Sequence, residues 1–267
     1  MSRWDEELGR AKAAAQEAGK AILDAMDQDL QVRDKGDHGN EVSPVTVADL
    51  AANDVIESSL SPFGYGWLSE ETEDSSGRLD QDLVWIVDPL DGTKEFLLGL
   101  PEFYVSIGLA YRGEVVVGVI YQPLEHRLVW ASATGGAYEN GESLQVSEMV
   151  TLHDATMAGS RGENKRRMFE PLLKHVAAIV PTGGMATKLH HVASGRCDFA
   201  VSLAPKNEWD LCGGDIIVRE AGGMVTDLSG KSVVYNQADP LIRGGIIVAP
   251  EALFPAVRQL LLELGLT

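Results

Sequence analysis

Two spacings of hydrophobic residues alternate along the chain and predict its helices and strands. Residues 4–26 place apolar or small side chains three or four positions apart, with charged residues between them, which predicts an amphipathic helix. A second helix is expected to begin near Thr46, with Thr46 or Ser43 as its N-cap. Between these helices, residues 31–44 are polar and rich in glycine, which indicates a loop. Residues 65–68 follow a turn and predict a short strand.

The rest of the chain divides into a strand-rich middle and an alternating second half. Apolar runs predict strands over 83–87, 104–110, 115–121 and 128–133, the last three as an antiparallel meander, with a hairpin around 135–142. Later segments predict strands over 155–160, 177–180, 198–203, 224–227 and 245–249, and helices over 165–175, 186–194, 211–221 and 253–264. This alternation is typical of α/β layering. We expect two halves, an N-terminal α+β half (1–150) and a C-terminal α/β half (151–267).

Composition narrows the class of protein. The chain has 267 residues and is 45% hydrophobic, enough for a sizeable core. No apolar run approaches the roughly 20 residues that span a bilayer, and the first ten residues lack a secretory signal, so we expect a cytoplasmic protein. Cys197 and Cys212 have no paired spacing and are expected to be buried, reduced thiols. A net charge of −18 argues against binding a nucleic acid polymer or an anionic membrane.

Carboxylates recur where predicted strands end and predicted helices begin. They are Asp49, Glu70, Asp88, Asp91 and Asp210. If the fold brings them together, two charges about 4 Å apart repel by roughly 4 kcal/mol at an effective dielectric near 20, so the cluster would need cations. An all-oxygen ligand set favours Mg²⁺ or Mn²⁺ over zinc. Two ions sharing Asp88 would suit in-line displacement of a phosphoryl group by water.

The turn that follows Asp88 could also hold a phosphate. Pro89 biases Asp88 toward an extended backbone, and Gly92 allows a close approach of the main chain. If residues 93–96 open a helix, the amides of Gly92 and Thr93 point outward at its N-terminus, where an anion is favoured. The same residues also make an ordinary turn, so this motif by itself leaves both interpretations open.

Four separated segments together resemble one enzyme family. They are Pro44-Val45-Thr46-Val47-Ala48-Asp49, Ser69-Glu70-Glu71, Asp88-Pro89-Leu90-Asp91-Gly92-Thr93, and Trp209-Asp210 with Ala221-Gly222-Gly223. In order and spacing they resemble the inositol monophosphatase superfamily of lithium-sensitive, Mg²⁺-dependent phosphatases, and the resemblance spans nearly the whole chain. It implies a layered α-β-α-β-α sandwich of the inositol monophosphatase and fructose-1,6-bisphosphatase type, and hydrolysis of a small phosphate monoester.

The resemblance also implies a role for each acidic position. Glu70, Asp88 and the carbonyl of Leu90 would hold a first Mg²⁺. Asp88, Asp91 and Asp210 would hold a second, and a third, weaker ion near Glu70 is typical of the family. Thr93, oriented by Asp49, would help to activate the attacking water, with Glu70 also in the catalytic set.

Four residues favour one branch of the superfamily. Lys94-Glu95 and Lys188 resemble the 3'(2'),5'-bisphosphate nucleotidases, and Leu203 stands where inositol enzymes carry an acid. An apolar side chain there cannot hydrogen-bond a sugar hydroxyl. We therefore expect removal of the 3'-phosphate from 3'-phosphoadenosine 5'-phosphate. The expected substrate contacts are Gly92, Thr93, Ser160, Arg161, Gly184, Lys188 and Asp210.

Two alternatives stay open at this stage. One is an inositol monophosphatase or sugar-phosphate phosphatase, and the other is a nucleotide-binding protein with a vestigial site. Intact acidic positions argue against the second, since decay would strike them first. A homodimer is compatible with either reading.

Overall fold

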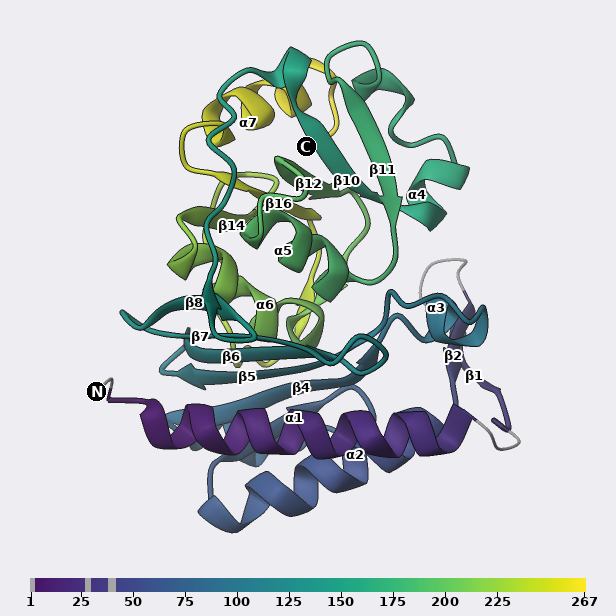
Figure 1. Cartoon of the computed structure of the whole chain (residues 1–267), viewed down its shortest axis with the longest axis vertical. Helices are drawn as coiled ribbons and strands as arrows, with labels where there is room; N and C mark the ends of the chain where they lie inside the picture. The colour runs from purple at the N-terminus through teal and green to yellow at the C-terminus, as the bar shows by residue number, and fades with distance from the viewer. Residues whose placement is uncertain (1–2, 27–29, 38–41) are drawn as a thin grey trace.

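Two β-sheets alternate with three layers of helices in the computed structural model, which describes residues 3–26, 30–37 and 42–267 (Figure 1). The outer layer below the first sheet consists of α1 (Asp5–Met26) and α2 (Val47–Leu60). Helices α5 (Met185–Ala193) and α6 (Glu208–Glu220) lie between the two sheets, and α7 (Phe254–Glu263) covers the far side of the second. This is the α-β-α-β-α sandwich that the family resemblance implies.

The first sheet has seven strands in the order β3-β4-β5-β6-β7-β8-β9. Their bounds are β3 Gly66–Ser69, β4 Leu83–Asp91, β5 Tyr104–Tyr111, β6 Glu114–Gln122, β7 Arg127–Ser132, β8 Gly136–Glu139 and β9 Glu142–Ser143. β3 runs parallel to β4 and the other pairs are antiparallel, which confirms the predicted meander. Along β4, Trp85 packs with the α1 and α2 core, while Ile86 packs with the core that contains α5 and α6. Both faces of this sheet are therefore buried.

The second sheet has five strands in the order β11-β10-β12-β16-β14. Their bounds are β10 Thr156–Ser160, β11 Ala178–Thr182, β12 Phe199–Ser202, β14 Gly223–Asp227 and β16 Ile246–Pro250. β10 is parallel to both of its neighbours, whereas β16 is antiparallel to β12 and β14. Leu260 and Leu261 of α7 pack with Phe199 and Ile247 in a separate core on the outer face.

Short elements complete the chain. They are strands β13 (Lys206–Asn207) and β15 (Leu241–Ile242), helices α3 (Thr93–Leu97) and α4 (Arg161–Lys165), and the 3₁₀ turns Ser61–Phe63, Ser76–Asp80, Leu152–Asp154 and Glu170–Leu172. Both cysteines are free and buried, as predicted. Within the described parts of the chain, every helix is too short or too polar to cross a membrane. The division of the chain at residue 150 stays a prediction.

Two predictions of secondary structure were wrong. Part of the loop expected over 31–44 forms an antiparallel pair, β1 (Arg33–Asp37) with β2 (Val42–Val45), because main-chain pairing does not require apolar side chains. Residues 38–41 of that loop lie outside the described residues. The helix expected over 165–175 is also absent, since Arg167 has a φ of 64° and Pro171 removes a main-chain donor.

Candidate active site

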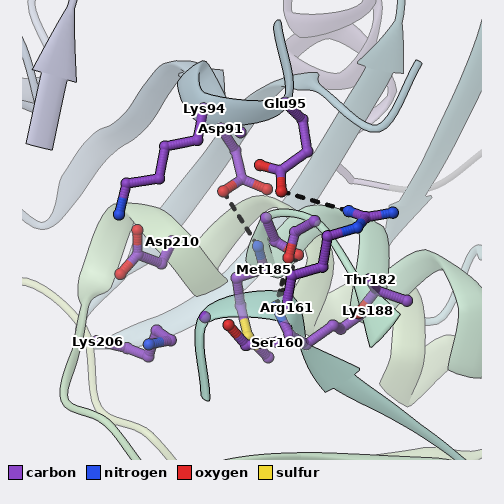
Figure 2. Close-up of a pocket in the computed structure, with 14 residues that line it drawn as sticks. Asp91, Lys94, Glu95, Ser160, Arg161, Thr182, Met185, Lys188, Lys206 and Asp210 are labelled. Atoms are coloured by element: carbon purple, nitrogen blue, oxygen red, sulfur yellow. Dashed lines mark hydrogen bonds and ion pairs between the residues drawn. The ribbon is translucent and has the colours of Figure 1, made fainter. Parts of the chain in front are cut away.

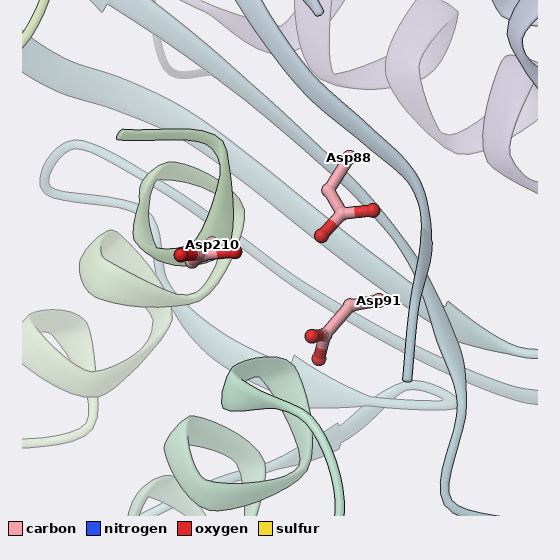
Figure 3. Close-up of side chains that lie close together, drawn as sticks. All are labelled: Asp88, Asp91 and Asp210. Atoms are coloured by element: carbon pink, nitrogen blue, oxygen red, sulfur yellow. The ribbon is translucent and has the colours of Figure 1, made fainter. Parts of the chain in front are cut away.

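Three carboxylates converge in the space between the two sheets (Figure 3). Asp88 and Asp91 lie near the end of β4, and Asp210 lies in the first turn of α6. One oxygen from each lies within 4.8 Å of the others, the only such trio of potential metal ligands in the described part of the chain. The fold thus unites acids that the sequence carries in two distant segments.

The turn after β4 holds its two acids in place by main-chain contacts. The amide of Leu90 donates to Asp88 Oδ1 at 3.1 Å, which fixes one carboxylate against its own turn. Gly92 has a φ of +94°, and a Cβ there would lie 2.6 Å from the carbonyl oxygen of Glu102. Only glycine fits both conditions, so the sharp exit from β4 into α3 depends on this residue.

The carboxylate of Asp91 lies on the N-terminus of α5. Met185 N donates to Asp91 Oδ1 at 3.0 Å and Ala186 N donates to Oδ2 at 2.6 Å. These amides would otherwise lack partners within the helix, and the helix dipole favours an anion there. Each carboxylate oxygen keeps a further lone pair, so Asp91 can still bind a cation.

Two other acids also act as helix caps. Thr46 N donates to Asp49 Oδ2 at 2.7 Å in a capping box at the start of α2. Asn207 N donates to Asp210 Oδ2, also at 2.7 Å, at the start of α6. Thr93 Oγ1 lies 3.0 Å from Asp49 Oδ1 and 3.1 Å from the carbonyl of Leu90, so its single proton can be donated to either. The capping role and a role in the site are therefore compatible.

Glu70 follows β3 at the edge of the same site. Parallel pairing places Ser69 beside Val87, and Glu70 N donates to the carbonyl of Val87 at 3.2 Å. Glu70 thus comes directly alongside Asp88, since parallel strands end at the same edge. It does not belong to the trio within 4.8 Å, but its charge raises the pKa of Asp210.

Burial and mutual repulsion disfavour ionisation of the trio. Burial, and then the charge of Asp210, raise the pKa of Asp91 to about 7, although Lys188 and the α5 amides oppose the shift. Asp210 keeps some exposed surface, but its carboxylate lies deep in the site, and burial raises its pKa to about 6. A bound cation relieves both costs, so this oxygen-only set fits Mg²⁺.

A cleft of about 270 Å³ opens beside Asp91 and Asp210 (Figure 2). Its lining includes four cationic side chains, those of Lys94, Arg161, Lys188 and Lys206. Gly92, Ser160, Gly162, Thr182, Gly183, Gly184 and Met185 also line it. The predicted substrate contacts Gly92, Ser160, Arg161, Gly184, Lys188 and Asp210 therefore share one cleft, with Thr93 beside it.

Arg161, Lys188 and Lys206 differ in the groups that already bind them. Arg161 makes a two-pronged ion pair with Glu102, at 2.5 and 2.6 Å, and a longer one with Glu95 at 3.3 Å. Lys188 is 2% exposed and donates to the carbonyls of Gly183 and Gly184, and burial lowers its pKa to about 8. Lys206 Nζ donates to the carbonyl of Pro205 at 3.0 Å.

Sequence reasoning missed residues that act through others. Glu102 precedes β5 in a loop and carries no motif, and its partners are 59 and 81 residues away. Glu163, in α4, accepts hydrogen bonds from the amides of Leu203 and Ala204 at 2.6 and 2.7 Å and so ties α4 to the segment that leads to Lys206. No local pattern marks either residue, because both are defined by contacts between distant segments.

The fold and the acidic trio are those of a metal-dependent phosphatase. The sequence model of the inositol monophosphatase family matches residues 4–262, and the chain belongs to that family. The family is Mg²⁺-dependent, in agreement with the oxygen-only trio, and the chain is therefore a hydrolase of small phosphorylated substrates.

Individual relatives extend along nearly the whole chain. An inositol-1-monophosphatase of Mesorhizobium japonicum is 36% identical over 259 residues, covering 92% of this chain and 94% of the relative. The crystal structure of the extragenic suppressor protein SuhB from Bartonella henselae has a TM-score of 0.83 at 32% identity, with 95% and 97% of the two chains covered. CysQ from Bacteroides thetaiotaomicron, a bacterial member of the family, has a TM-score of 0.77 at 30% identity, with 93% and 98% covered.

Proposed function

We propose that the enzyme is a 3'(2'),5'-bisphosphate nucleotidase that removes the 3'-phosphate of 3'-phosphoadenosine 5'-phosphate to give AMP. The observation that carries the proposal is the group of four cations in the cleft beside the trio. In a chain with a net charge of −18, such a cluster is favourable for an anion besides the phosphate that is hydrolysed.

The position of Leu203 also supports a bisphosphate. Its side chain packs against the outer core and does not line the cleft. A hydroxyl-rich ring therefore meets no acid at this position. Lys206, in contrast, lies close enough to the site for its charge to oppose the rise in the pKa of Asp210 that burial causes. We assign Lys206 and Lys94 to the second phosphate, with Lys188 beside them. Arg161 is already paired with two carboxylates, which makes it the weaker candidate.

We assign the metal ligands as Glu70, Asp88, Asp91, Asp210 and the carbonyl of Leu90. When bound, Mg²⁺ lowers the pKa of water and stabilises a departing oxygen, and Mn²⁺ can replace it. The number of ions, two or three, is part of the proposal.

The protein's own groups would orient the reaction. Thr93 Oγ1 would donate its hydrogen bond to Asp49 Oδ1, which leaves a lone pair of Thr93 Oγ1 to accept a hydrogen bond from the attacking water. The amides of Gly92 and Thr93 at the start of α3 would bind the phosphate. Ser160 and Gly184 also line the cleft and would contact the substrate.

The test is phosphate release from 3'-phosphoadenosine 5'-phosphate, inositol 1-phosphate and fructose 1,6-bisphosphate with Mg²⁺, with and without lithium. We expect preference for the nucleotide and inhibition by lithium. Lys206→Met should raise KM for the nucleotide by about 10-fold or more, because a charge-assisted hydrogen bond contributes about 1.5–3 kcal/mol. It should change KM for inositol 1-phosphate far less. Lys231→Met, at an exposed lysine, is the control.

Inositol monophosphatase activity is the second candidate, because the Mesorhizobium relative carries that name. Preference for inositol 1-phosphate, with Lys206→Met without effect, would replace our assignment of substrate while keeping the metal site. Tight nucleotide binding without release of phosphate would instead indicate a binding protein with a vestigial site.

A further inference from the structure

Glu102 joins three segments at the back of the cleft. Its carboxylate accepts hydrogen bonds from both terminal nitrogens of Arg161, and Glu102 Oε2 also accepts a hydrogen bond from the amide of Gly183 at 2.6 Å. Burial opposes its ionisation, but the hydrogen bonds and charge of Arg161 outweigh burial and hold the pKa of Glu102 below its ordinary value. Glu102 therefore stays an anion that links the loop before β5, the start of α4 and the turn before α5.

That turn leads directly to Asp91. Gly183 is bonded to Glu102, Gly184 follows, and the amides of Met185 and Ala186 donate to the two oxygens of Asp91. The turn has no free space. A Cβ at Gly183 would lie 2.8 Å from the carbonyl oxygen of Glu102, and one at Gly184 would lie well under 3.0 Å from the Asp91 carboxylate.

The main chain of Glu102 reinforces the same arrangement. Its carbonyl oxygen would lie 2.6 Å from a Cβ at Gly92 and 2.8 Å from one at Gly183, so the turn that carries Asp91 and the turn before α5 both pack against this one residue. Thr187 Oγ1, in the first turn of α5, lies 3.5 Å from the same carbonyl. A displacement of Glu102 would therefore move the donors of Asp91 as well as the strand end that carries it.

We propose that Glu102 is a positioning residue that orients Asp91 for its cation through the Gly183–Gly184 turn. The inference rests on the proposed role of Asp91 as a metal ligand. Glu102 contacts neither substrate nor metal in this assignment, and it acts by fixing the direction of the two α5 amides. Groups that orient a metal ligand in this way typically change metal affinity by about 10–100-fold when they are removed.

The experiment measures Mn²⁺ binding to the purified protein by isothermal titration calorimetry, together with the unfolding midpoint without metal. We expect Glu102→Ala to weaken Mn²⁺ binding by about 10-fold or more. Glu102→Gln should weaken it less, because an amide oxygen can still accept the Gly183 N–H. Glu170→Ala removes the exposed partner of Arg167 and should bind Mn²⁺ as the parent protein does. Asp91→Asn is measured in parallel.

The outcomes separate the two proposals. If Asp91→Asn binds Mn²⁺ normally, the metal assignment itself fails. If Asp91→Asn weakens binding while a folded Glu102→Ala and Glu102→Gln both bind normally, only the positioning role is wrong. Should Glu102→Ala fail to fold, Glu102→Gln decides: weaker Mn²⁺ binding with an unchanged unfolding midpoint supports positioning, and normal binding overturns it. Equal weakening in Glu170→Ala would mean that the effect is not specific to Glu102, and it would also overturn the inference.

Discussion

Gly184→Ala is the sharpest single perturbation of the site. Gly184 has φ −54° and ψ 179°, which alanine adopts without strain, so the backbone should accept the change. Its new Cβ would nevertheless lie well under 3.0 Å from both oxygens of Asp91. The substitution therefore acts on one carboxylate while keeping the local fold.

The size of the effect follows from that overlap. An ordinary contact requires at least 3.4 Å, so the carboxylate of Asp91 must withdraw. A withdrawal of roughly 1 Å in a catalytic group can cost about 100-fold in rate. The amides of Met185 and Ala186 would lose their alignment with Asp91 at the same time. We expect kcat/KM with Mg²⁺ to fall by about two orders of magnitude.

The assay is steady-state phosphate release at saturating Mg²⁺, with circular dichroism to verify the fold. Gly9→Ala is the matched control, because Gly9 lies exposed in α1 and a Cβ there meets nothing within 4 Å. It should keep full activity and gain about 0.5–1 kcal/mol of stability. A folded Gly184→Ala enzyme with unchanged kcat/KM would refute the reasoning that the position of Asp91 controls turnover.

Three further predictions concern the framework of the site. Thr46→Ala removes the cap that also donates to Asp49 at 2.6 Å, and should cost about 1 kcal/mol in urea unfolding and lower kcat more than it changes KM; unaltered stability and kcat would contradict it. Arg78→Ala removes a buried guanidinium that pairs with the partly exposed Asp74 at 2.7 Å and donates to Asn236 Oδ1, and should cost about 1.5–3 kcal/mol by the same measurement; a loss below about 1 kcal/mol would show that these contacts matter little. Burial lowers the pKa of His190, so the unfolded chain takes up its proton first, and the contribution of His190 to stability should fall as pH drops below about 6.5; the stability of the parent protein relative to His190→Gln should therefore decrease over this range, and a difference that does not change with pH would exclude a role for His190.

The sequence predicts best the helices and strands whose buried side chains recur at regular spacing. The observed bounds of α1, β5, β6 and β7 agree with the predicted ranges to within a few residues. The sequence narrows the N-cap of α2 to Thr46 or Ser43, and the structure has Thr46 there, because a capping side chain acts on its own helix. Such features depend on residues that are close in sequence, so they can be predicted from the sequence alone.

Features that depend on distant partners could not be predicted. β1 is polar and β2 contains a proline, so the composition of this pair resembles that of a loop. The four acidic segments could be found because each lies where a strand ends or a helix begins. Their convergence was predicted only through the family resemblance, since the positions of element ends do not specify which elements lie side by side. The role of Glu102 was not predicted, because it depends on hydrogen bonds with Arg161 and Gly183, which are distant in sequence.

The hydrogen bonds between Asp91 and the start of α5 join residues 94 and 95 positions apart. Contacts of such long sequence separation carry a large loop-closure cost and are slow to form in folding. We therefore expect the acidic trio to assemble after the transition state, when the two sheets have already docked. A metal held there would slow unfolding more than it accelerates folding. The same ion would then increase the kinetic stability of the enzyme by prolonging the lifetime of its folded state.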